Sequence, residues 1–121
     1  MKELDVEPAD GSANVGVRRR KLVWFVPEEA LDATRDAVFA AGAGRIGSYE
    51  RCSWYTAGTG TFLGGEETEP TIGEAGREER TPELRVETVV PADRAQAVIA
   101  ALLEAHPYEE VAYDLYELAE L

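Results

Sequence analysis

The sequence predicts an α+β fold of the ferredoxin-like type, in which a split βαβ repeat places two helices on one face of a four-stranded antiparallel sheet. The main observation is an internal repeat. An apolar run, a valine–proline pair and a helical pattern occur first at Val26-Pro27 and again at Val90-Pro91. Each copy continues into a break and a second β-like segment, so the predicted order is strand–helix–strand, twice. Right-handed crossovers then place both helices on the same face.

The chain has 121 residues, the usual size of a single domain. Residues 1–19 are polar, small and aperiodic, which predicts a disordered tail. Residues 20–121 are then expected to form a single domain. Within it, residues 21–26 (KLVWFV) are almost entirely apolar, as expected for a central strand that is buried on both faces or at an oligomer interface.

Pro27 begins the first predicted helix, because the first helical position needs no backbone N–H. The core-facing stripe of this helix has helical spacing and consists of Leu31, Thr34, Val38 and Ala41. Gly42 and Gly44 are expected to end the helix. Residues 42–47 (GAGRIG) also match the dinucleotide pattern G-x-G-x-x-G, which requires a preceding strand and a following helix. The order here is reversed, which favours a helix-ending turn.

The second half of the pattern follows the same order. Residues 48–57 (SYERCSWYTA) contain aromatic and β-favouring side chains and are predicted as the second strand. Residues 64–81 lack periodicity and are rich in glycine and acidic residues, which predicts an extended loop between the second and third strands. Residues 83–90 and 111–115 alternate as strands. Pro91 opens the second helix, whose stripe is Ala95, Val98, Leu102 and Ala105.

Composition argues against several classes of protein. The net charge of -12 repels phosphate backbones, so we expect no nucleic-acid binding. Cys52 is the only cysteine, which rules out an intrachain disulfide and favours a reducing compartment. No apolar run approaches the length of a membrane helix, and residues 1–16 do not resemble a signal peptide. We therefore expect a cytoplasmic protein without membrane contact.

Two segments carry the candidate binding residues. One is a glycine-rich rim whose backbone amides can form a nest for an anion, and the other is the helix–strand junction that contains the only histidine. The predicted ligand- or partner-binding residues are Gly58, Gly60, Thr61, Phe62, Gly64, Gly73, His106, Tyr108 and Glu109. The structural alternatives are a simple hairpin tip and a histidine that interacts with the negative end of the helix dipole.

The candidate ligands of a divalent metal ion, the candidate cofactor, are Cys52, His106 and Glu109, because borderline ions accept thiolate, imidazole and carboxylate donors. One histidine and one cysteine are few for a site within one subunit, so a metal is expected mostly between subunits. Cys52 is better explained as a small core or interface residue than as a nucleophile. No catalytic triad is recognisable, and we expect no enzymatic activity.

Several segments together resemble the YqfO-type domain: residues 42–49 with Cys52, residues 58–62, residues 72–73 with 83–87, and residues 106–114. That domain occurs inserted in proteins of the Nif-three family, which are dinuclear-metal proteins often labelled GTP cyclohydrolase type 2-like. It also occurs alone in short proteins. The resemblance covers residues 21–119 and implies the architecture of the PII signalling proteins and the CutA divalent-cation-tolerance proteins.

The resemblance also implies a homotrimer, with the loop at residues 64–81 in the place where PII proteins carry the loop that contacts their protein partners. It carries over no hydrolase activity, because the flanking lobes that hold the metal centre of the larger proteins are missing from this pattern. The leading hypothesis is a non-enzymatic homo-oligomer that binds a small ligand, an ion or a protein partner in clefts between subunits. The alternatives are a CutA-like divalent-metal protein and an accessory domain of a Nif-three-like metal hydrolase system.

Overall fold

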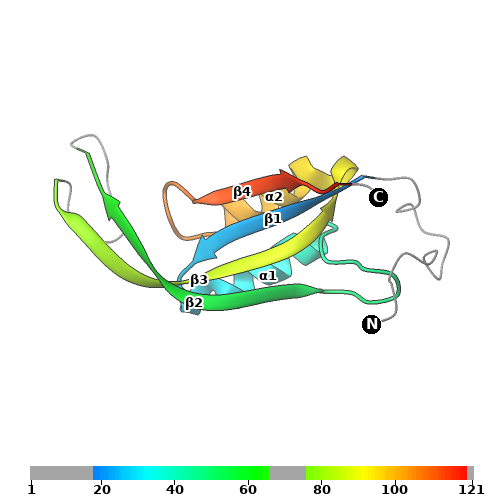
Figure 1. The fold of residues 1–121 in the computed structure, drawn as a ribbon, viewed down its shortest axis with the longest axis horizontal. Helices are drawn as coiled ribbons and strands as arrows, with labels where there is room; N and C mark the ends of the chain where they lie inside the picture. The colour runs from blue at the N-terminus through cyan, green and yellow to red at the C-terminus, as the bar shows by residue number, and fades with distance from the viewer. Residues whose placement is uncertain (1–17, 66–75, 120–121) are drawn as a thin grey trace.

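The computed structural model describes residues 18–65 and 76–119. These residues form one antiparallel sheet of four strands with two helices packed on one of its faces (Figure 1). Residues 1–17 of the predicted tail and residues 66–75 of the predicted loop, including the candidate Gly73, lie outside the described residues. No helix in the described part of the chain is long and apolar enough to cross a membrane.

The order of elements along the chain is that of a doubled βαβ unit. The elements are β1 (Arg19–Val26), η1 (Glu28–Ala30), α1 (Leu31–Ala40), β2 (Ser53–Leu63), β3 (Glu78–Pro91), η2 (Ala92–Arg94), α2 (Ala95–Ala105) and β4 (Tyr113–Glu117). The strands lie side by side in the order β2-β3-β1-β4, and every neighbouring pair is antiparallel. The predicted α+β, ferredoxin-like fold is confirmed, and β1 has the predicted central position.

The two valine–proline pairs have the same structural role. Pro27 and Pro91 have φ angles of -66° and -62°, and each is followed by one 3₁₀ turn and then a helix. The pyrrolidine ring fixes φ near this value and supplies no N–H, so it suits a residue that leaves a strand and starts a helix. The sequence repeat therefore corresponds to a repeat in the structure.

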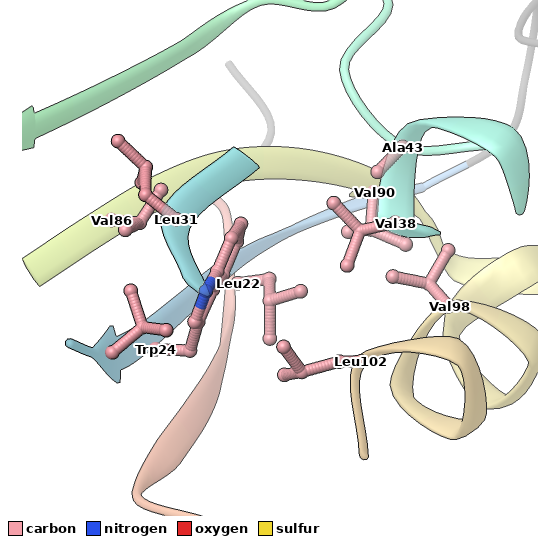
Figure 2. Close-up of a cluster of buried hydrophobic side chains, with 10 residues drawn as sticks. Leu22, Trp24, Leu31, Val38, Ala43, Val86, Val90, Val98 and Leu102 are labelled. Carbon is pink, nitrogen blue, oxygen red and sulfur yellow. The ribbon is translucent and has the colours of Figure 1, made fainter. Parts of the chain in front are cut away.

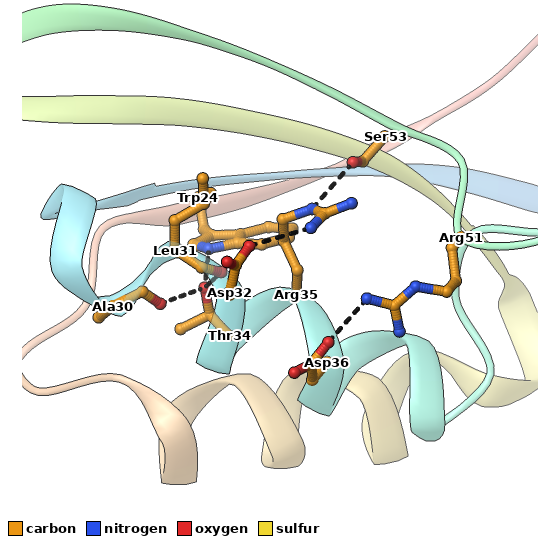
Figure 3. Close-up of polar contacts among 9 residues, drawn as sticks. All are labelled: Trp24, Ala30, Leu31, Asp32, Thr34, Arg35, Asp36, Arg51 and Ser53. Atoms are coloured by element: carbon orange, nitrogen blue, oxygen red, sulfur yellow. Dashed lines mark hydrogen bonds and ion pairs between the residues drawn. The ribbon is translucent and has the colours of Figure 1, made fainter.

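The hydrophobic core fills the space between the helices and one face of the sheet (Figure 2). Leu22 and Trp24 of β1 contribute from the sheet, and Val38 and Leu102 contribute from α1 and α2. The polar groups of Trp24 and Thr34 that are buried there have partners: the Trp24 indole N–H donates to the Thr34 hydroxyl oxygen at 3.0 Å. That hydroxyl lies 3.0 Å and 2.9 Å from the carbonyl oxygens of Ala30 and Leu31, which accept its hydrogen (Figure 3).

The second strand begins later than the sequence pattern predicts. Ile46 and Tyr49 pair across a tight turn, and Gly47 and Arg51 have positive φ angles of 58° and 57°. Left-handed backbone cannot continue a strand, so β2 starts only at Ser53. It then continues without a break through Leu63.

The β2–β3 hairpin is longer than predicted and extends beyond the rest of the sheet. β1 ends where Val26 pairs with Leu84, whereas β2 and β3 remain paired as far as Leu63 and Glu78. Residues 58–63 and 78–83 therefore form a two-stranded arm that projects past the helices (Figure 1). Residues 78–81 were predicted as loop, but they are strand because they pair with residues 60–63 of β2, a register that local sequence pattern does not reveal.

Candidate binding site at the base of the arm

His106 is neutral and links the end of α2 to β1. It follows the last residue of α2 and is only 6% exposed. Its Nε2 lies 2.7 Å from the Phe25 carbonyl oxygen, and its Nδ1 accepts the Tyr108 backbone N–H at 3.2 Å. A carbonyl only accepts and an N–H only donates, so the proton of the ring is on Nε2. Burial lowers the pKa of His106, and the bond to Phe25 opposes that change only in part.

The second residue of the site is Tyr108, which lies next to His106. Its ring lies 5.0 Å from the His106 ring, measured between centroids. The hydroxyl oxygen of Tyr108 is buried and has no hydrogen-bond partner. Burial raises the pKa of Tyr108, and the negative charges of Glu83 and Glu29 raise it further. The phenol is therefore held in its neutral form, with a hydrogen to donate and two carboxylates in its surroundings.

Glu83 lies near Tyr108 and beside the glycine-rich strand. Burial raises the pKa of Glu83 above that of an ordinary carboxyl group. A Cβ atom added to Gly60 would lie 2.5 Å from a carboxylate oxygen of Glu83, so only glycine leaves room for this side chain to lie across β2. Sequence reasoning missed Glu83 as a site residue, because its place depends on the register of β2 against β3. The only available signal was the alternation of charged residues along the third strand.

Of the other predicted binding residues in the described part of the chain, Gly58, Thr61 and Phe62 lie on the arm, and Gly64 follows its first strand. Thr61 and Phe62 pair with Arg80 and Glu79, farther from the base. The Gly64 carbonyl accepts the Gly76 N–H at 2.6 Å at the end of the described hairpin. Glu109 is exposed beside Tyr108. The structure thus places Tyr108 and Gly60 near Glu83, with His106 beside Tyr108. Thr61, Phe62 and Gly64 lie farther along the arm.

The three candidate metal ligands are not gathered within one subunit. The Cys52 N–H donates to the Gly44 carbonyl at 2.8 Å, and its own carbonyl accepts the Thr88 hydroxyl at 2.6 Å. Thr88 pairs with Leu22, whereas His106 contacts Phe25 near the other end of β1. No group of three or more His, Cys, Asp or Glu side chains in residues 18–65 and 76–119 could hold a metal ion. A metal site between subunits stays a prediction.

A cluster of arginines and acids near the glycine motif has a structural role (Figure 3). The guanidinium groups of Arg35 and Arg51 lie 5.3 Å and 4.8 Å from the centroid of the Phe39 ring. Arg51 also pairs with Asp36 at 2.7 Å, and Arg35 pairs with Asp32 at 3.1 Å. Because these cations are already paired, they attach the connection after α1 to the helix and form no anion site.

The sequence comparisons identify similar proteins that are much longer than this chain. No known family profile matches the sequence. Over 93% of its length the chain is 48% identical to a GTP cyclohydrolase 1 type 2 homolog of Mycobacterium tuberculosis, and over 82% it is 50% identical to that of Halalkalibacterium halodurans. It is similar to one segment of these proteins. The matched segment is 29% and 27% of their lengths, respectively.

Solved structures give the same result. A Bacillus cereus protein related to NIF3 superposes with a TM-score of 0.73 at 43% identity, covering 86% of this chain and 26% of that one. The divalent cation tolerance protein CutA of Archaeoglobus fulgidus (TM-score 0.63, 10% identity) and Bacillus subtilis GlnK with ATP (0.58, 13%) each cover 84% of this chain and 85% of theirs. The last two show a shared fold alone. The resemblance to Nif-three relatives and to the CutA-like fold is confirmed at this level.

Proposed function

We propose that this chain is a non-enzymatic homo-oligomer of the PII/CutA-like type, a trimer, that binds a small ligand at the base of the arm. The observation that carries the proposal is the buried Tyr108 hydroxyl, which has no hydrogen-bond partner. Leaving such a group unpaired costs about 1–3 kcal/mol. A ligand that accepts its hydrogen removes this cost on binding.

The surroundings of the hydroxyl indicate the chemistry of the ligand. Glu83 and Glu29 place negative charge near Tyr108, so an anionic ligand is disfavoured there. A neutral or cationic molecule with one acceptor for the phenol and donors for the carboxylates fits best. The non-enzymatic assignment is supported by His106, because both of its ring nitrogens are already hydrogen-bonded and the ring is not placed to act as a general base.

The test removes only the hydroxyl. The melting temperature of wild type, Tyr108→Phe and Tyr55→Phe is measured with ZnCl₂, CuCl₂, ATP, GTP and spermidine as separate probes. We expect at least one probe to stabilise the wild type and to bind about tenfold more weakly to Tyr108→Phe. Tyr55 is a matched control, because its ring is 50% exposed. A probe that binds both tyrosine variants equally, or no stabilisation by any probe, contradicts the proposed site.

A second candidate function, an accessory domain of a Nif-three-like system, is favoured by the positions of the first and last described strands. β1 begins where β4 ends, and Arg18 and Arg20 each lie 3.5 Å from a carboxylate oxygen of Glu117. A domain whose chain enters and leaves at one place can be inserted into a longer protein. Capture of a separately expressed Nif-three-like chain would support this function. A homotrimer that captures no such chain would contradict it.

Two finer expectations remain proposals. A protein partner at the loop of residues 64–81 falls mostly on residues 66–75, which lie outside the described residues. CutA-like metal binding requires ligands from more than one subunit, because no suitable group exists within the described part of one subunit. Calorimetry with copper or zinc on the wild type and on His106→Ala tests it, and unchanged binding would exclude His106 as a ligand.

A further inference from the structure

The face of the sheet opposite to the helices, here called the open face, is covered by no element of the described chain (Figure 1). Residues that pair across antiparallel strands point to the same side. Trp54 therefore shares the open face with its partner Glu87, and Tyr116 shares it with Lys21. These aromatic rings are 58% and 49% exposed. Large exposed aromatics on an uncovered face are typical of an interaction surface.

The open face is close to neutral although the chain carries a net charge of -12. Its cations are Arg19, Lys21 and Arg85, and its carboxylates are Glu79, Glu83, Glu87 and Asp114. Two of these carboxylates differ in their surroundings. Glu87 pairs with Lys21 and Arg85 at 3.8 Å and 3.0 Å, whereas Glu83 lies on the arm, away from Arg19. A second copy can therefore approach this face with little net repulsion, with its cationic end toward Glu83.

Gly58 is a glycine that the subunit itself does not require. It lies within β2 and pairs with Glu83, so it shares the open face. A Cβ atom added to it would meet nothing within 4 Å, and its φ is not among the positive values. Glycine within a strand weakens that strand and is typical of a close approach by another backbone or a ligand. Gly60, two residues away, differs because Glu83 fills its space.

We propose that Gly58 is the contact point for a second copy of this chain. An aromatic side chain from the open face of the neighbouring subunit packs directly on the bare backbone of β2, and the cationic end of that face approaches Glu83. The inference depends on the homo-oligomer proposed above and identifies the surface that forms it. One contact then explains the absent side chain at Gly58, the exposed aromatic side chains and the near balance of charge on the face.

The test places a valine on each of the two faces of β2 in turn. Gly58→Val adds a side chain on the open face, and Ala57→Val adds two methyl groups on the opposite face, where Ala57 is exposed. Solution mass is measured against concentration by light scattering for both variants and the wild type. We expect Gly58→Val to raise the dissociation constant of the oligomer at least about tenfold and Ala57→Val to leave it unchanged.

Thermal unfolding at low concentration shows whether the variants fold, and Gly58→Ala is the milder substitute if Gly58→Val does not. In the free subunit Gly58→Ala is expected to keep or raise the melting temperature, because it restricts the unfolded chain and meets no atom. A wild-type oligomer that keeps its dissociation constant in the Gly58 variants overturns this inference alone. A wild type that is monomeric at every concentration overturns the proposed homo-oligomer, and this inference with it.

Discussion

The two helix-to-strand connections of the repeat start from the same pattern and are held in different ways. After α1, the connection is attached by ion pairs and hydrogen bonds whose two partners both lie in the subunit. Examples are Arg51 with Asp36 and the Gly44 N–H with the Val89 carbonyl. After α2, the connection is attached by His106, and it leaves the Tyr108 hydroxyl buried and unpaired. The contacts of the first connection are satisfied within the subunit, whereas the second connection leaves a buried hydroxyl without a hydrogen-bond partner. Function is therefore expected at the second.

The same contrast applies to the glycines of the two regions. Gly44 lies in the first connection, and a Cβ atom there would be 2.7 Å from the Phe39 ring, so packing within the subunit accounts for it. Gly58, on the arm, has no such reason within the subunit. Features that the subunit explains belong to folding, whereas features that it leaves unexplained indicate what binds to it.

The largest expected effect is in the core beneath both connections. Leu102 is fully buried, and Leu103 on the same helix is 43% exposed. Leu102→Ala should lower the free energy of unfolding by about 2–5 kcal/mol, because it removes buried contacts and leaves a cavity. Leu103→Ala should change it by less than about 1 kcal/mol. Urea denaturation measures both, and equal losses would show that α2 packs on a different face.

A smaller effect concerns the second connection and depends on pH. The pKa of His106 in the folded protein is lowered by burial from the ordinary value of 6.5. Below about pH 6.5 the unfolded chain therefore binds a proton that the folded chain resists. The stability contributed by neutral His106 is fully present above that pH and is lost progressively as the pH falls toward the folded pKa.

The measurement compares urea denaturation of wild type and His106→Gln from pH 7.5 to 5.5. We expect the wild type to lose more stability than the variant over this range. The pKa of Glu83 is raised, so protonation of Glu83 at low pH favours the folded state and acts in the opposite direction. Both proteins contain Glu83, and the difference between them therefore isolates the histidine. Parallel pH dependences would show that folding does not lower the pKa of His106.

The repeat and its helices could be predicted from the sequence because they depend on local periodicity. The stripe residues Leu31, Val38, Val98 and Leu102 are buried as predicted. The start of β2 could not be predicted, because it depends on positive φ at Arg51, and the pattern gives no signal for a non-glycine residue in that conformation. Such a residue is held there by its surroundings, here the contacts with Asp36 and Phe39.

The candidate site was predicted in part for a related reason. His106, Tyr108 and Gly60 were found from their residue types, which suggest binding chemistry wherever they stand. Glu83 was missed because its contact with Gly60 is set by the register of a long hairpin, which no local pattern determines. The unpaired Tyr108 hydroxyl was likewise invisible, because only the packed structure shows which polar atoms lack partners.

The smallest expected effect tests whether the first connection is purely structural. Arg51→Ala removes the pair with Asp36 and the contact with the Phe39 ring. The side chain is half exposed, so solvent screens both interactions, and the free energy of unfolding should fall by no more than about 1 kcal/mol. The loss should shrink as salt is added. Probe binding and solution mass should stay as in the wild type, since the site lies at the other connection. A change in either would show that the two connections are not functionally distinct.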